Sequence, residues 1–166
     1  MATEIQQWRV ADFMRETVVK VPITATLREA LIVMIRERTN GVVVVDAQGK
    51  VGGILSSWDF IQHIVPDYLE EDKHLASFEA GETFIELARQ IAGDPITKFM
   101  TKQVHTIMPE QSIMQAAALL STFHIRQLPV VDKEGKLVGY LNRTDVKLAM
   151  GKALELIDEI PSREIS

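Results

Sequence analysis

Two places in the sequence carry a hydrogen-bonding side chain followed three residues later by an aspartate. These are Ser56 with Asp59 and Asn142 with Asp145, each at the predicted start of a helix. A carboxylate accepts several hydrogen bonds and a neighbouring hydroxyl or amide adds more, so each pair could hold a polar ligand. The first turn of the helix would also direct free backbone N–H groups at an anion. The same spacing is that of a helix cap, and the two roles can coexist.

Residue patterns for catalysis or metal binding are missing from the sequence. It has no Gly-x-x-x-x-Gly-Lys loop, no Gly-x-Ser-x-Gly elbow and no His-Glu-x-x-His motif. Cysteine is absent, and His63, His74, His105 and His124 lack the close spacing of metal ligands. We therefore predict a protein that is not an enzyme, with no catalytic residue, no metal ligand and no required cofactor.

Both aspartate motifs lie in a segment that occurs twice. Residues 10–65, the first copy, align without gaps on residues 96–151, the second copy. Phe13-Met14 then meets Phe99-Met100, and Asp59 meets Asp145. Eight of the twenty positions in 41–60 are identical to their mates in 127–146, which indicates an internal duplication.

Each copy predicts the same order of elements, β-α-β-β-α. Short, nearly unbroken Val-rich runs between turn residues predict strands, and apolar residues at helical spacing predict helices. Capping boxes mark the first helix of each copy, Thr26 with Glu29 and Ser112 with Gln115. The predicted strands are Val18–Val21, Val42–Val45 and Val51–Leu55 in the first copy, and Val104–Ile107, Leu128–Val131 and Leu137–Leu141 in the second.

The hairpin turns and the helices also repeat. Gly49 and Gly135 stand at the fourth turn position, where a left-handed backbone angle suits glycine. A second helix opens near Ser57 and near Arg143. The apolar stripes of the first helices are Leu27, Ala30, Leu31, Met34 and Ile35 in one copy, and Ile113, Ala116, Ala117 and Leu120 in the other.

One copy of about 55 residues buries too little surface to be stable alone, so we predict that the two copies share one core. The fold class is then α/β (α+β), with two β-α-β-β-α motifs packed sheet to sheet. The predicted segments are 1–66 for the first motif with an N-terminal arm, 67–95 for an acidic and helical linker, 96–150 for the second motif, and 151–166 for a C-terminal helix and tail.

Two further apolar stripes lie outside the strands and first helices. The linker stripe contains Phe84, Leu87, Ala88 and Ile91. The stripe of the last helix contains Ala149, Met150, Ala153, Ile157 and Ile160, and that helix is predicted to run to Ile160 before Pro161 ends it. Either stripe covers the core or forms a dimer surface.

The second copy resembles a cystathionine-β-synthase (CBS) motif. The resemblance is carried by residues 128–146, Leu-Pro-Val-Val-Asp-Lys-Glu-Gly-Lys-Leu-Val-Gly-Tyr-Leu-Asn-Arg-Thr-Asp-Val, with Phe99-Met100 upstream. Residues 42–60 and Asp12-Phe13-Met14 repeat the pattern. Members of this family usually pair two motifs about a pseudo-two-fold axis. The resemblance implies two clefts that bind AMP, ADP, ATP or S-adenosylmethionine, and a homodimer of such modules.

The family's ribose-binding signature is glycine, two apolar residues, serine or threonine, two further residues and aspartate. Residues 53–59, Gly-Ile-Leu-Ser-Ser-Trp-Asp, match it in full. Family geometry adds the start of the other copy's hairpin, where Arg126 would bind phosphate through its planar fork and His124 would add charge. The resemblance therefore implies a first site made of Ile54, Ser56, Asp59, His105, His124, Ile125, Arg126 and Gln127.

The resemblance also implies a mirror-related second site. Its members are Tyr140, Asn142, Asp145, Val19, Thr39, Asn40 and Gly41. Asn142 stands where the signature has serine or threonine, and no residue there equals Arg126. We therefore predict that the Asp59 site binds an adenosine ligand more tightly than the Asp145 site.

Bulk composition narrows the classes of partner. The net charge is −5, which disfavours a nucleic-acid or anionic-membrane surface. The first residues are polar, and no apolar run reaches the roughly 18 residues of a membrane helix. We expect a cytoplasmic protein without nucleic-acid or membrane partners.

Two functions are compatible with these features. The first is a regulatory sensor of an adenine nucleotide or S-adenosylmethionine that acts, as a homodimer, on a separate and unknown protein. The alternative is a ligand-free scaffold for dimerisation or protein interaction, with Trp8 and Trp58 as candidate anchors. We favour the sensor because the first copy matches the ribose signature in full.

Overall fold

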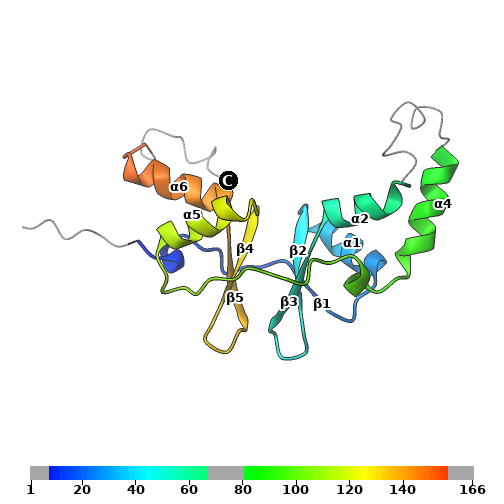
Figure 1. The fold of residues 1–166 in the computed structure, drawn as a ribbon, viewed down its shortest axis with the longest axis horizontal. Helices are drawn as coiled ribbons and strands as arrows, with labels where there is room; N and C mark the ends of the chain where they lie inside the picture. Colours follow the sequence, from blue (N-terminus) through cyan, green and yellow to red (C-terminus); the bar gives the residue numbers. More distant parts are fainter. Residues whose placement is uncertain (1–7, 67–80, 157–166) are drawn as a thin grey trace, which may run out of the picture. The chain divides into compact units, whose positions relative to one another are not determined.

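The strands and helices of the chain fall into two units (Figure 1). The computed structural model describes residues 8–66 and 81–156. Val19–Val104 form the first unit, and the described residues before Val19 and after Val104 form the second. The fold class is mixed α/β with a repeated motif, as predicted, whereas the packing of one motif's sheet on the other stays a prediction. In the described ranges, no helix is both long and apolar enough to span a membrane.

The first unit is built on a three-stranded sheet. Its strands are β1 (Lys20–Pro22), β2 (Gly41–Val45) and β3 (Val51–Ser56), in that order. β1 runs parallel to β2, and β2 and β3 form an antiparallel hairpin. The parallel pairing requires a crossover, which the first helix of the copy provides.

Within residues 19–66 and 81–104, helical elements accompany this sheet. Helix α1 (Leu27–Arg36) joins β1 to β2, and α2 (Ser57–Ile64) follows β3 directly. Helix α4 (Gly81–Ala92) packs against α1 and α2, and a short 3-10 helix, η3 (Ile96–Lys98), comes next. The capping box of α1 is confirmed, because the Glu29 carboxylate accepts a 2.8 Å hydrogen bond from the Thr26 amide.

The second unit contains a two-stranded sheet. Strands β4 (Gln127–Val131) and β5 (Leu137–Asn142) form an antiparallel hairpin. Helices α5 (Ile113–Thr122) and α6 (Arg143–Ala153) pack against each other and against these strands (Figure 1). The 3-10 helix η1 (Val10–Asp12) belongs to this unit.

The strand predicted at Val104–Ile107 is wrong in extent, since only its last residue pairs, in an isolated bridge to β4. In the first unit the Val43 amide donates a 3.1 Å hydrogen bond to the Val19 carbonyl. The residue aligned with Val43 is Pro129, which has no N–H, so the matching bond to the carbonyl of His105 cannot form. Pro109, which is aligned with Ile23, likewise cannot supply the 2.8 Å hydrogen bond that the Ile23 amide donates to the Val45 carbonyl. An apolar run in the sequence does not reveal either missing donor.

Each core takes in residues from the beginning of the other copy. We call residues 10–15 and 96–101 the leading segments. The first core contains Val21, Ala25, Leu27, Ala30, Met34, Val42, Val44 and Leu55, together with Ile96, Phe99 and Met100. The second core contains Ile107, Ala116, Leu120, Leu128, Val130 and Leu141, together with Val10, Phe13 and Met14. The leading segments are thus exchanged between the copies. The segment boundaries predicted from the sequence follow the order along the chain and stay predictions.

Close approach by the leading segments explains one shared glycine. A Cβ atom at Gly53 would lie 2.6 Å from Met100 Sδ and 3.0 Å from the carbonyl oxygen of Thr101, the residue after Met100. At Gly139 it would lie 2.8 Å from Met14 Sδ and 3.1 Å from the next carbonyl oxygen. Both distances to sulfur are shorter than a carbon can tolerate, so each return strand needs glycine at this position.

The turn and helix-end predictions are mostly confirmed. Gly49 and Gly135 adopt left-handed angles, with φ of 80° and 81°. In the second copy's capping box, the Gln115 side chain accepts a 2.9 Å bond from the Ser112 amide. The five apolar residues predicted at helical spacing all lie in α1, although the Ile35 side chain is 75% exposed.

The two outer stripes behave differently. In α4, Ile91 packs against the first core, but Phe84 is exposed. In α6, Ala149 is buried, and the helix ends at Ala153 instead of running on to Ile160. The left-handed backbone of Glu155 (φ 60°) follows this end. Ile157, Ile160 and the acidic part of the predicted linker lie outside the described residues.

Candidate functional site

The serine–aspartate pair of the first copy forms the cap of α2. The Ser56 amide and hydroxyl both donate to Asp59 Oδ2, each at 2.6 Å. The Asp59 side chain is half-buried, and among the described residues no hydrogen bond engages its second oxygen, Oδ1. The cap thus leaves Asp59 with one carboxylate oxygen available to a ligand.

The leading segment of the second copy runs beside this cap. Thr101 forms an antiparallel bridge with Ile54, in which the two amides donate to each other's carbonyls at 2.9 and 3.0 Å. Asn40, next to β2, accepts a 2.9 Å bond from the Ser57 amide, and Gly41 pairs with Ser56 across the hairpin. The backbone around the Asp59 cap is therefore fixed on three sides.

The second copy has the same cap with a different side-chain partner. The Asn142 amide donates to Asp145 Oδ2 at 2.8 Å, and Asn142 Oδ1 accepts from the amides of Thr144 and Asp145. Asp145 Oδ1 accepts a 3.0 Å hydrogen bond from Arg15 Nε. Asp145 is 3% exposed, so this is a buried carboxylate paired with an arginine.

Arg15 reaches Asp145 because its backbone is fixed on the return strand. Arg15 and Tyr140 form the bridge that corresponds to Thr101 and Ile54, with bonds of 2.8 and 2.9 Å. Sequence reasoning missed Arg15. The repeat alignment contained the signal, since Arg15 matches Thr101 and both immediately follow the Phe-Met pair.

The phenol of Tyr140 lies in the same environment. Burial raises the pKa of Tyr140 above 10.0, and the nearby negative charge of Asp145 raises it further, while Arg15 acts in the opposite direction. The phenol is therefore neutral at physiological pH and can donate or accept a hydrogen bond.

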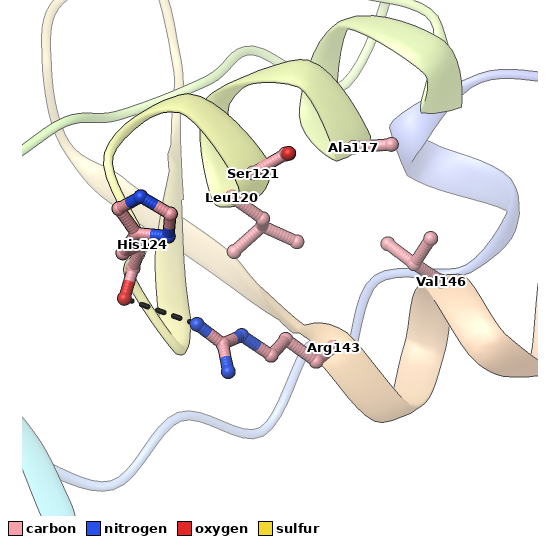
Figure 2. Close-up of a pocket in the computed structure, with 6 residues that line it drawn as sticks. All are labelled: Ala117, Leu120, Ser121, His124, Arg143 and Val146. Carbon is pink, nitrogen blue, oxygen red and sulfur yellow. Dashed lines mark hydrogen bonds between the residues drawn. The ribbon is translucent and has the colours of Figure 1, made fainter.

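The loop between α5 and β4, residues 123–126, carries three of the predicted phosphate-side residues. His124 adopts a left-handed backbone with φ of 52°, as does the aligned Arg38 with φ of 51°. The Arg143 guanidinium donates to the carbonyls of His124 and Ile125, both at 3.0 Å (Figure 2). This arginine holds the loop in place, and sequence reasoning identified it only as a helix start.

The remaining candidates of this unit are spread around the loop. Arg126 is exposed, and Gln127 pairs with Asn142 across the hairpin. The His105 ring stacks on Phe123, with centroids 3.7 Å apart. Pro129 cannot donate a hydrogen bond to the His105 carbonyl, so the position of the His105 ring is set by its stacking on Phe123.

A cavity of about 390 Å³ lies between α5, α6 and the same loop. Figure 2 shows its six lining residues, which are Ala117, Leu120, Ser121, His124, Arg143 and Val146. The Arg143 side chain lines the cavity and also donates a hydrogen bond to the His124 carbonyl (Figure 2). The cavity shares only His124 with the predicted ligand residues. Within the described part of the chain, no cluster of three or more His, Cys, Asp or Glu side chains could hold a metal.

The structure brings together part of each predicted site. Ile54, Ser56 and Asp59 share the first unit with Val19, Thr39, Asn40 and Gly41. Tyr140, Asn142 and Asp145 share the second unit with His105, His124, Ile125, Arg126 and Gln127. The two predicted sites each combine residues of both units, and these combinations stay predictions.

Comparison with protein families gives a clear result. A model of the CBS domain matches residues 10–66 and 95–152, which together make up more than half of the chain. The two matched ranges contain both aspartate caps and both leading segments.

Two solved structures are similar in fold. One is CBSX2 in complex with AMP; CBSX2 is a chloroplastic CBS domain-containing protein of Arabidopsis thaliana. Its TM-score is 0.68 and its sequence is 25% identical, and the match covers 89% of this chain and 98% of that chain. The CBS domain pair of MJ0100, in complex with 5-methylthioadenosine and S-adenosyl-L-methionine, has a TM-score of 0.65 and 22% identity, covering 87% and 97%. At this identity the second likeness shows the fold alone.

Some curated relatives are much longer than this chain. A homoserine O-acetyltransferase of Methanocorpusculum labreanum is 29% identical over 142 residues, which cover 84% of this chain and 24% of the acetyltransferase. The chain spans about a quarter of the length of the three acetyltransferases that it matches.

Proposed function

The chain belongs to the CBS domain family, and we propose that it is a regulatory module that binds an adenosine ligand. The observation that carries the proposal is the cap at Asp59. It joins a complete ribose signature to a carboxylate oxygen that the cap does not use. The AMP bound by CBSX2, a relative with 25% identity, supports the same ligand class.

At the first site, Asp59 Oδ1 would accept a hydrogen bond from the ribose diol, with Ser56 and Ile54 beside it. Phosphate oxygens would be met by Arg126, whose guanidinium is exposed and whose loop is held by Arg143. His105, His124, Ile125 and Gln127 would complete this site. The residues predicted for the second site stay a prediction; they are Tyr140, Asn142, Asp145, Val19, Thr39, Asn40 and Gly41.

AMP, ADP, ATP and S-adenosylmethionine share the adenosine group and differ in charge. Arg126 is the one arginine among the residues predicted for this site, and AMP carries the fewest phosphate groups of the three nucleotides, so AMP is the first ligand to test. We propose that the chain itself catalyses no reaction, and that its likeness to acetyltransferases reflects a shared CBS segment. We also propose that it works in the cytoplasm as a homodimer and that ligand binding changes its affinity for a separate protein.

Calorimetric titration with the four ligands tests this function. We expect saturable binding of at least one, and its loss by at least tenfold in Asp59→Asn, which removes the charge but keeps the volume. Glu29→Gln is the matched control, since Glu29 also caps a helix of the first unit and loses the same charge. Equal loss in both variants would contradict a specific role for Asp59.

One observation favours the scaffold function instead. Trp58 and Ile61, three residues apart on α2, are 66% and 46% exposed, which is uncommon for large apolar side chains. If folded protein gives no heat with any of the four ligands but sediments as a tight dimer, the scaffold replaces the sensor. Trp58→Ser should then weaken the dimer.

A further inference from the structure

We propose that Arg15 closes the second ribose position, so that the chain binds one adenosine ligand at Asp59 and none at Asp145. This inference rests on the proposed function and adds to it a residue that determines how many ligands bind. Its basis is the 3.0 Å hydrogen bond from Arg15 Nε to Asp145 Oδ1.

The two caps differ in how many carboxylate oxygens are already hydrogen-bonded. At Asp59 both cap donors use Oδ2, and the side chain is half-buried. At Asp145 one oxygen holds the Asn142 amide and the other holds Arg15, and the residue is 3% exposed. A ribose diol needs an accessible carboxylate oxygen, so it would have to displace the guanidinium.

The difference comes from one position of the repeat. Arg15 and Thr101 occupy equivalent places, each bridged by two backbone bonds to the residue after the signature glycine. The backbones therefore match, and only the side chain changes. Threonine has a short, neutral side chain and brings no charge to Asp59, whereas the longer arginine side chain brings its guanidinium to Asp145.

The contact can open without moving the backbone. The Arg15 side chain is 53% exposed, so a rotation would take the guanidinium into solvent while its amide and carbonyl stay paired with Tyr140. Opening would leave the Asp145 carboxylate buried and without its cation. Because an unpaired buried carboxylate is unfavourable, the arrangement with Arg15 bound to Asp145 is the more stable one unless a ligand replaces the arginine.

The test exchanges the two side chains at these positions. Wild-type protein titrated with the adenosine ligand that it binds should give one site per chain, and Arg15→Thr should give two. In the Asp59→Asn background, where binding is lost, adding Arg15→Thr should restore one site. A further Asp145→Asn change should remove that site again. Thr101→Arg alone should lower binding at the Asp59 site at least tenfold.

The controls separate this inference from the proposed function. Arg9→Thr removes the same charge from the same unit at an exposed position and should leave one site. Arg15→Gln serves as a second variant if Arg15→Thr does not fold, and it should also give two sites. If the wild type binds no adenosine ligand, the proposed function fails. If the wild type binds but Arg15→Thr and Arg15→Gln still give one site, or if the wild type already fills two, Arg15 does not close the second position.

Discussion

The glycine of each ribose signature has a packing role besides any ligand role. In both units it lets a methionine of the exchanged leading segment lie against the return strand. A family signature read only as a ligand motif would assign this glycine to the ligand. The geometry shows that the fold itself requires it, because the approaching groups are a methionine side chain packed in the core and the backbone carbonyl of the residue that follows it.

Gly139→Ala should therefore destabilise the protein by about 1–3 kcal/mol, the usual cost of overpacking a filled core. The added Cβ would meet Met14 Sδ at 2.8 Å and a carbonyl oxygen at 3.1 Å, and the backbone contact cannot rotate away. Urea denaturation measures the change. Gly93→Ala is the control, since a Cβ there meets nothing within 4 Å, and it should change stability by less than about 0.5 kcal/mol. Similar losses in both variants would contradict the packing role.

Tyr140 gives a pH prediction at the same scale. Its pKa is raised above 10.0 by burial and by Asp145, while an unfolded chain has the ordinary value. The unfolded state therefore loses the phenol proton first, and the stability contributed by the neutral phenol falls as pH rises above 10. The difference in ultraviolet absorption between wild type and Tyr140→Phe, titrated from pH 8 upward, isolates this group. A midpoint at or below 10 would contradict the buried phenol.

At the scale of elements, two prolines separate the two copies. The first copy has a three-stranded sheet, and the second has two strands and a single bridge. The missing strand follows from Pro129 and Pro109, which cannot donate the hydrogen bonds that Val43 and Ile23 make in the first copy. His105 is consequently held by its ring on Phe123 instead of by its carbonyl.

Pro129→Val should therefore extend the bridge by one pairing toward His105, while Pro109 still ends the pairing after Ile107. The new amide would donate to the His105 carbonyl, as the Val43 amide donates to Val19 at 3.1 Å. Amide hydrogen exchange measured by NMR should show residue 129 protected to the same degree as Val43. Val43→Pro is the reciprocal control and should remove protection from β1. An unprotected amide at residue 129 would mean that another feature keeps the strand short.

At the scale of the whole molecule, the sequence predicted the elements well and their partners poorly. Capping residues and glycine turns are local, so Thr26, Ser112, Gly49 and Gly135 could be assigned from neighbours in the chain. The exchange of leading segments could not be predicted, because Phe13-Met14 and Phe99-Met100 are nearly identical and fit either core equally on composition. The role of Arg15 could not be predicted for a similar reason, because its partner Asp145 is 130 residues away in the sequence.

The caps themselves were predictable, but their availability to a ligand was not. The Ser-x-x-Asp spacing gives the cap at Asp59, whereas the free state of Oδ1 depends on what the leading segment brings beside it. The second copy brings Thr101 beside the Asp59 cap, whereas the first copy brings Arg15 to Asp145. Long-range packing, which periodicity does not report, decides this difference.

The exchange also predicts where the chain can be cut. A fragment of residues 19–104 contains a sheet, its helices and the leading segment that fills its core, with Ile96, Phe99 and Met100. Domains of this size can fold alone, so we expect a cooperative thermal transition by circular dichroism. A fragment of residues 9–94 has equal length, every strand of the first copy and the whole of α4, but it lacks those three core side chains. Losing three buried apolar side chains removes several kcal/mol, so this fragment should show no cooperative transition. Equal melting of both fragments would mean that the leading segment is dispensable to the core that it enters.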